Sequence, residues 1–285
     1  MHEAPHLAPP WDGQAYSVKR HGVSITNCDS EPVQTPGCVQ AHGAMLVLRP
    51  ADLTILQASE NSDRLLGHPA PSLLNESVRV VIGAEGEASL RTFLATEPTE
   101  RNPLYVCTIP ARMDVPPLDL TAHTVDGVAV LEFEATGRIG AGEPDYYALV
   151  KKTVVRLQTA VTLREFCDVA VGEIRALTGL DRVMVYRFHA DGHGEVFAES
   201  KRADLDPWLG LHYPAGDFPQ PAREIFKQIW ARPTPDVSGD LAELVPLTNP
   251  DTGRPLTMTH CALRGASVMY CRDTTWAKNS HAART

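Results

Sequence analysis

The sequence predicts an α+β protein of two domains, each an antiparallel sheet with flanking helices. Strand-like runs rich in β-branched residues alternate with short helical patterns from residue 37 onward, and Gly- and Pro-marked turns separate them. A glycine-rich stretch within residues 136–150 interrupts this pattern near the middle of the chain and predicts a linker. Because 285 residues are enough for two ordinary cores, the chain is divided at that stretch.

The first half predicts a small mixed domain, residues 26–135, after a flexible N-terminal segment, residues 1–25. That segment carries prolines and histidines without periodicity. A Pro-Ala-Asp turn separates the first two predicted strands, and Pro-Pro and Asp-Gly pairs separate the last three. Strands are predicted at residues 44–48, 54–57, 105–109, 118–123 and 128–133, and helices at 59–66 and 87–94.

The second half, residues 151–285, has a helix whose start is marked by Thr162 and Glu165. In such a capping box each side chain accepts a hydrogen bond from the other residue's backbone, and Gly179 predicts the helix end. Strands are predicted at residues 183–188 and 194–199, then a helix at 221–231 with Ile225, Phe226 and Ile229 on one side. Residues 233–260 follow no regular pattern, and a loop of that length is usually functional or disordered.

The bulk composition argues against several classes of function. The formal net charge of −9 disfavours a phosphate-binding surface, so no nucleic-acid partner is expected. No apolar run reaches the roughly 20 residues that span a bilayer, and the N-terminus lacks the apolar core of a secretory signal. We therefore expect a cytoplasmic protein without membrane contact. No Walker loop, GxGxxG after a strand or GxSxG elbow occurs, which predicts a protein that is not an enzyme.

Cysteine and histidine spacing predicts neither a disulfide scaffold nor a metal site. The six cysteines are scattered and form no CxxC pair, and Cys167 lies on the apolar stripe of a predicted helix. His189, His193 and Glu195 are close in sequence but match no familiar metal-ligand spacing. Solvated hairpin residues explain these three more simply.

A few residues stand out as candidates for binding. Cys28 lies in a polar, turn-rich segment, where a thiol can act as a nucleophile or serve no role at all. Asp217 is bracketed by Pro214 and Pro219 before a helix, which fixes its pose or simply caps the helix. Arg232 and Arg264 could clamp a carboxylate, although solvation is the default for a single arginine. The residues alone leave these alternatives open.

Several motifs together resemble the bacteriophytochromes. They are ITNCDSEP at 25–32 with the following PG, VQ and HG pairs, DRVMVYRF at 181–188, GEVFAE at 194–199 and PAGDFP at 214–219. The likeness runs in order from about Thr26 to Ser267. It implies a PAS domain at 26–135 that carries the attaching strap, and a GAF domain at 151–285. It also implies a figure-eight knot, in which residues 233–260 form a lasso and Val39 lies in the threaded segment.

The resemblance further implies a red/far-red photoreceptor that binds biliverdin IXα, with D-ring isomerisation as its signal. Carried over by position, Cys28 forms the thioether and Asp217 bonds the pyrrole N–H groups. The remaining expected contacts are Arg232 and Arg264 to propionate, Tyr186, Tyr213 and Phe218 around the D ring, and Met184 and Pro219 packing beside it. In full-length relatives the expected partners are PHY and histidine kinase domains and a response regulator, and a homodimer is a further expectation.

The chain also departs from the family pattern. Phe226 stands where many relatives have a tyrosine, and Tyr270 falls where the family has a histidine beside the pyrroles. The residues after Ser267 do not follow the family's closing strands, which predicts a GAF domain that is incomplete at its C-terminus. Cys271 is an alternative attachment site. The alternative function is a light-independent PAS/GAF module for small-molecule binding or dimerisation.

Overall fold

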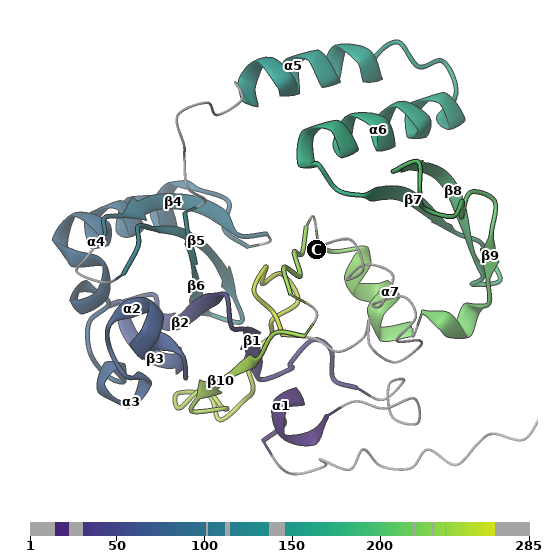
Figure 1. The fold of residues 1–285 in the computed structure, drawn as a ribbon. Coiled ribbons are helices and arrows are strands. Elements are labelled where there is room, and N and C mark those ends of the chain that lie inside the picture. Colours follow the sequence, from purple (N-terminus) through teal and green to yellow (C-terminus); the bar gives the residue numbers. More distant parts are fainter. Residues whose placement is uncertain are drawn as a thin grey trace, which may run out of the picture. The chain divides into compact units, whose positions relative to one another are not determined.

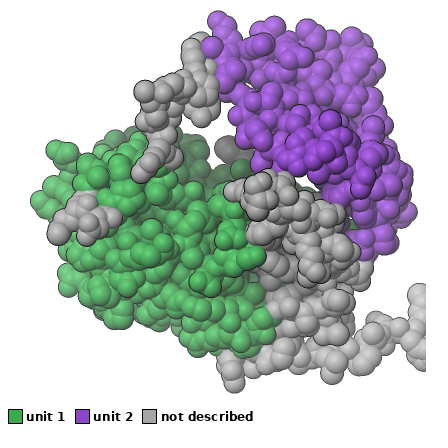
Figure 2. All heavy atoms as spheres, in the orientation of Figure 1, with its two compact units in different colours: residues 1–137, 220–274 green, residues 138–219, 275–285 purple. Residues whose placement is uncertain are grey.

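The computed structural model describes residues 15–22, 31–100, 102–111, 115–136, 146–218, 220–229, 231–236 and 238–265. The chain forms two compact units, one from residues 1–137 and 220–274 and the other from residues 138–219 and 275–285 (Figure 2). Each unit has its own sheet and its own helices (Figure 1). Among the described residues, no helix combines the length and hydrophobicity that crossing a bilayer requires.

A seven-stranded antiparallel sheet organises the first unit. Its strand order is β1-β10-β3-β2-β6-β5-β4. The strands are β1 Cys38–Gln40, β2 Gly43–Arg49, β3 Thr54–Ser59, β4 Leu104–Ile109, β5 Leu118–Val125, β6 Val128–Ala135 and β10 Leu241–Val245. The five strands predicted in the first half are therefore confirmed, and each extends one or two residues beyond its predicted range at one end or both. Segments from both ends of the described chain complete the sheet, since purple β1 lies beside yellow-green β10 in Figure 1.

Most helices of this unit are short, and glycine ends one of them and interrupts the longest. They are α1 Val18–His21, α2 Ser62–Leu66, α3 Ala70–Leu73, α4 Arg79–Thr96 and α7 Gln220–Phe226. Gly67 ends α2 in the left-handed conformation, as the sequence predicts. At Gly83 the φ angle of 73° interrupts α4 near its start, a conformation that only glycine adopts easily. The helix predicted at 87–94 is the part that follows this break.

Both faces of the sheet are covered, which explains the continuous burial of β2. Leu46 and Leu48 contact the layer formed by α2, α3 and α4. Met45 and Val47, which alternate with them, contact a second layer from the 256–263 segment. This second layer contributes Leu256, Met258, Cys261 and Leu263, all nearly inaccessible to solvent. The end of the segment predicted to be an irregular loop therefore contributes Leu256 and Met258 to this core.

The prediction that residues 233–260 are irregular is wrong for residues 241–245. These form β10, which pairs with β1 on one side and β3 on the other. A later segment of the chain, residues 263–265, also bonds to β1. The amide of Gln40 donates to the carbonyl of Leu263 at 2.8 Å. The amide of Gly265 donates to the carbonyl of Cys38 at 2.9 Å. Strand β1 is thus held between β10 and residues 263–265. These contacts agree with the expected place of Val39, while the knot itself stays a prediction.

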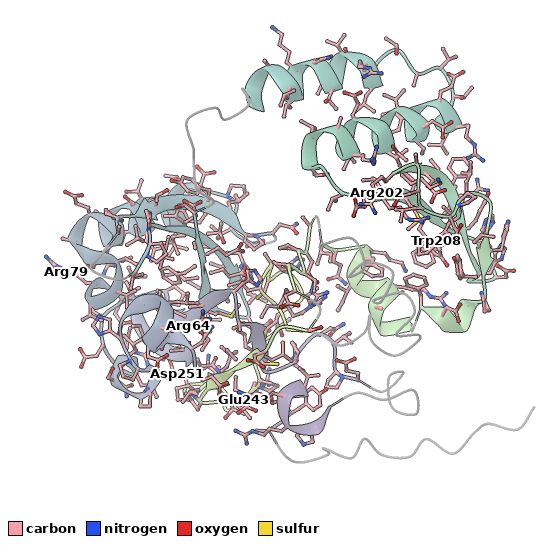
Figure 3. All side chains as sticks on the ribbon, in the orientation of Figure 1. Arg64, Arg79, Arg202, Trp208, Glu243 and Asp251 are labelled. Atoms are coloured by element: carbon pink, nitrogen blue, oxygen red, sulfur yellow. The ribbon has the colours of Figure 1, made fainter. Side chains whose placement is uncertain are left out.

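The described part of the N-terminal segment has regular structure, contrary to the expectation of a flexible lead-in. Tyr16 and Val18 are buried, and one helical turn, α1, follows. Arg20 forms a bidentate ion pair with Glu243 of β10, with two N···O distances of 2.7 Å (Glu243 is labelled in Figure 3). Neither the burial of Tyr16 and Val18 nor the ion pair of Arg20 has a periodic signature in the sequence. The chain before residue 15 lies outside the described residues.

Helix α7 is shorter than the predicted helix at 221–231, and only part of its expected apolar face is buried. Ile225 is 1% exposed, whereas Phe226 is 44% exposed. Since α7 and β10 both belong to the first unit, the assignment of residues 151–285 to a single GAF domain stays a prediction.

In the second unit, helix α6 packs on a three-stranded sheet and helix α5 packs on α6. Its elements are α5 Tyr146–Leu157, α6 Leu163–Thr178, β7 Arg182–Phe188, β8 Gly194–Lys201, β9 His212–Tyr213 and the 3₁₀ turn η2 Ala215–Asp217. The predicted capping box is confirmed in both directions at Thr162 and Glu165, and Gly179 is left-handed. Cys167 is buried against Phe197 and Ala198, which confirms it as a core residue. Helix α5 begins inside the stretch predicted to be a linker.

Replacing Leu244 with alanine should destabilise the first unit by about 2–5 kcal/mol, because this side chain is 1% exposed in the core that β10 shares with β1 and β3. Chemical denaturation followed by circular dichroism measures the change. The matched control is Leu209→Ala, since Leu209 is 54% exposed and its truncation should cost under about 0.5 kcal/mol. Equal stability of the two variants would contradict the role of β10 in that core.

Candidate functional site

Arg264 is a buried cation that forms no ion pair with the residues that the structure describes. Its side chain is 4% exposed, and its Nε and Nη1 atoms have no hydrogen-bond partner among the described residues. Burial, and secondly the nearby Arg232, lower the pKa of Arg264 to about 10, while Cys261 and Glu31 oppose the shift. The guanidinium is still charged at neutral pH. A buried charge normally has a counter-ion, so this position is suited to an anionic ligand.

The second predicted arginine lies beside the first. The Nε and Nη2 atoms of Arg232 donate to the backbone carbonyl of Arg264, at 3.3 and 3.1 Å. Gln40 of β1 ties the same region together, since its side-chain amide donates to the carbonyl of Pro233 at 2.9 Å. Two like charges are therefore held together by backbone and amide contacts, a typical arrangement for a carboxylate or phosphate site.

Arg264 is positioned by the sheet of the first unit. Its backbone forms a bridge with Val39 of β1. The preceding amide, that of Leu263, donates to the carboxylate of Glu132 on β6 at 2.6 Å. Glu132 and the nearby His123 are almost completely inaccessible to solvent. The residues that fix Arg264 therefore come from three separate parts of the chain.

Burial controls the protonation of this supporting pair. It raises the pKa of Glu132 to about 7, with the amides of Leu263 and Ala262 opposing the rise, and it lowers the pKa of His123 to about 4. The Nδ1 of His123 lies 3.9 Å from a carboxylate oxygen of Glu132, beyond hydrogen-bond distance. We conclude that the two groups are not an ion pair at neutral pH, because burial disfavours both charges.

In the second unit, four aromatic rings gather on one face of the sheet. The ring centroids of Tyr186 and Phe218 are 4.8 Å apart, and those of Tyr186 and Tyr213 are 6.1 Å apart. Phe188 joins them, 5.2 Å from Tyr186 and 5.5 Å from Phe218. Tyr186, Tyr213 and Phe218, three of the predicted site residues, are thus brought together. Met184 lies two residues before Tyr186 on β7, so the two side chains are on the same face of the sheet.

The position of Tyr186 depends on Gly194 in the neighbouring strand. A Cβ atom at Gly194 would lie 2.1 Å from the Tyr186 ring, so any other residue at this position would force the ring to move. The GEVFAE motif therefore begins with glycine because the ring lies across the backbone there. Substitution of Gly194 would displace Tyr186 and with it the aromatic cluster.

A polar network fixes the loop that leads to Tyr213. Arg182 forms an ion pair with Glu199, and its guanidinium lies 3.9 Å from the ring centroid of Trp208 (labelled in Figure 3). The same Glu199 accepts a hydrogen bond from the Trp208 amide at 2.9 Å. Burial raises the pKa of Tyr213, with Asp217 and Glu199 adding to the rise and Arg182 opposing it. The charge of Asp217 therefore acts on the Tyr213 hydroxyl.

Asp217 ends the 3₁₀ turn η2 and is half-buried. Its amide donates to the carbonyl of Pro214 at 3.0 Å, which closes the turn. Pro214 is extended, with a φ of −62°, as a proline requires. The predicted fixed pose of the Asp217 backbone agrees with this geometry. Pro219, Cys28 and Cys271 lie outside the described residues.

Two features of the site escaped the sequence analysis. Phe188 belongs to the aromatic cluster, and its spacing of two residues from Tyr186 on a strand is the signal that could have found it. Glu132 supports the segment that carries Arg264, but an acidic residue in a largely apolar strand gives no sign of its partner. Only the folded chain brings it against Leu263.

The comparisons with known proteins agree with this arrangement. Residues 28–136 match the PAS fold family. Cyanobacterial phytochrome B from Nostoc sp. is 38% identical over 250 residues, which cover 87% of this chain and 33% of that protein. The bacteriophytochrome of Pseudomonas aeruginosa is 33% identical over 252 residues, again 87% of this chain and 33% of the relative. The chain spans about a third of the length of these curated relatives.

Solved structures extend the likeness to both units. The wild-type chromophore-binding domain of Stigmatella aurantiaca phytochrome P1 has a TM-score of 0.75 and 34% identity, covering 90% of this chain and 82% of that one. The fold is that of a phytochrome chromophore-binding region, including its PAS domain. The chain belongs to the bacteriophytochrome family, as the motifs predict.

Replacing Glu132 with glutamine should change the pH dependence of stability. Between about pH 4.5 and 7 the folded chain holds more protons at Glu132 than the unfolded chain does, so this group lowers the free energy of unfolding as pH rises. His123 has the opposite effect between about pH 4 and 6.5. With Glu132 removed, the free energy of unfolding should rise from pH 4.5 to 6.5 by roughly 2–3 kcal/mol relative to the native chain.

Urea denaturation across this pH range measures the effect, and glutamine keeps an acceptor for the Leu263 amide. The control is Glu76→Gln, because Glu76 is exposed. Parallel stability curves for the native chain and Glu132→Gln would show that Glu132 is not a buried, protonated carboxyl.

Proposed function

We propose that this chain is a light-sensing module that binds biliverdin covalently through Cys28 and responds to red and far-red light. The observation that supports the proposal most strongly is the buried guanidinium of Arg264, beside Arg232, in a chain of the phytochrome family. The module is sensory rather than enzymatic, and its chemistry is that of the pigment.

The residues present fit a linear tetrapyrrole. The pigment is apolar along its middle and carries two propionates, which need cationic partners. Arg232 and Arg264 would supply the cations. Tyr186, Tyr213 and Phe218 would supply an aromatic surface for the D ring, with Met184 beside them. Asp217 supplies acceptors for pyrrole N–H groups, and Pro219 follows in the motif. When bound, the bilin absorbs light and isomerises at its D ring.

The chemistry of the described cysteines supports attachment through Cys28. A thioether requires a reactive thiolate, and burial suppresses thiolate formation. Burial raises the pKa of Cys38 to about 12 and that of Cys261 far above its ordinary value, and it also raises the pKa of Cys107. None of these three is suited to the reaction. Cys28, in its family motif, is the proposed nucleophile, and Cys271 is the alternative.

We further propose that the module signals to other domains. A relative from Ceratodon purpureus, 32% identical, is named a light-sensor protein kinase, and this chain spans 19% of it. A PHY domain, a histidine kinase and a response regulator are the proposed partners in a longer protein, together with a second copy of the chain.

Co-expression with heme oxygenase should give a protein with a red-shifted absorbance band that changes under red light. The covalent link is measured by zinc-induced fluorescence of the denatured protein on a gel. Cys28→Ala should lose the fluorescent band completely, because no thioether forms, while non-covalent binding through Arg232 and Arg264 keeps the absorbance band.

Cys271→Ala is the matched control and should keep its fluorescence. If Cys271→Ala loses the band and Cys28→Ala keeps it, attachment is at Cys271. If biliverdin produces no shifted band with the native chain, the photoreceptor proposal is wrong and the light-independent binding or dimerisation module replaces it.

A further inference from the structure

Three histidines gather at one end of the sheet in the second unit. One ring nitrogen from each of His189, His193 and His212 lies within 4.8 Å of the other two. The rings of His189 and His193 are stacked, with centroids 4.2 Å apart and an interplanar angle of 7°. The His212 ring is 5.2 Å from that of His193. All three are partly or fully accessible to solvent.

The turn between β7 and β8 creates the first pair. The amide of His189 donates to the carbonyl of His193 at 2.9 Å, and the amide of Gly192 donates to the carbonyl of His189 at 2.9 Å. Gly192 has a φ of 87°, which suits glycine in a tight turn. The backbone therefore fixes His189 and His193 opposite each other. The hairpin thus brings the two side chains close enough for their rings to stack.

The third histidine comes from β9. His212 pairs directly with Glu195 of β8, and the next residue, Tyr213, pairs with Gly194. Because side chains alternate along a strand, His212 and Tyr213 lie on opposite faces. His212 thus joins the hairpin histidines, while Tyr213 joins the aromatic cluster. No sequence spacing predicts this grouping, since the strand pairing makes it.

Each hairpin histidine also bonds to a carboxylate. The Nδ1 of His193 is 2.5 Å from Asp191, and the Nε2 of His189 is 3.0 Å from Glu195. An acceptor on one ring nitrogen places the proton there and leaves a lone pair on the other. This carboxylate–histidine pairing is the usual support of a metal-binding imidazole.

We propose that His189, His193 and His212 bind one divalent transition-metal ion, with Asp191 and Glu195 holding the outer ring nitrogens. Three imidazoles suit Zn²⁺, Co²⁺, Ni²⁺ or Cu²⁺, and a water completes a four-coordinate site. Tetrahedral ligation places the nitrogens about 3.4 Å from each other, so the stacked rings of His189 and His193 must rotate out of their stack when the ion binds. The ion ties the two-residue strand β9 to the hairpin, and so fixes the start of the segment that leads to Asp217.

The test is a Co²⁺ titration of the native chain at neutral pH without bilin, followed by visible absorbance, and competition with Zn²⁺. We expect one Co²⁺ per chain, with a spectrum of nitrogen and oxygen ligands. His193→Gln and His212→Gln should weaken binding roughly 100-fold, and Glu195→Gln about tenfold, as supporting carboxylates do. His68→Gln is the matched control, because His68 lies in the other unit, and it should bind as the native chain does.

The pH dependence of metal binding is a second test of the proposed site, and it needs no variant. Acidification to about pH 5 should release the ion, since protonated imidazole cannot ligate. Absence of saturable binding, a thiolate charge-transfer band, or full binding by His212→Gln would each overturn the proposal. The site uses none of the residues assigned to the pigment, so its failure leaves the proposed light-sensing function untouched.

Discussion

The first unit is arranged around one constraint, the burial of the Arg264 guanidinium, with which no described residue forms an ion pair. Arg264 is 4% exposed, and its position is set by Val39 of β1 and, through Leu263, by Glu132 of β6. Keeping a charge there costs stability unless an anion pairs with it. The strands around it hold the guanidinium in place, and at the proposed site a carboxylate ligand would stabilise the folded chain.

The same segment performs a second task. Residues 256–263 cover the face of the sheet that the helices leave open, so the long connection is a structural layer as well as the carrier of Arg264. This explains why β2 is apolar without alternation. The second unit is built differently. There a three-stranded sheet separates an aromatic cluster, around Tyr186, from a histidine cluster, around His189.

Much of the fold follows from local signals, and the site does not. The capping box at Thr162 and the turn glycines are local, so the sequence predicts them correctly. Strand β10 is only five residues long and exists because β1 and β3 pair with it, which no local pattern reveals. The roles of Arg232 and Arg264 came from family resemblance, because two arginines 32 residues apart carry no sign of their contact. His212 likewise reaches its neighbours only through strand pairing.

The account is tested most directly by comparing biliverdin with its dimethyl ester, which has no acid groups. Absorbance titration of Cys28→Ala measures reversible affinity for each pigment. Charge-assisted hydrogen bonds contribute about 1.5–3 kcal/mol, so the free acid should bind roughly 10- to 100-fold more tightly. Adding Arg264→Gln should remove most of that preference. Equal affinity for acid and ester, or a preference that survives without Arg264, would contradict the claim that the buried guanidinium is the anion site.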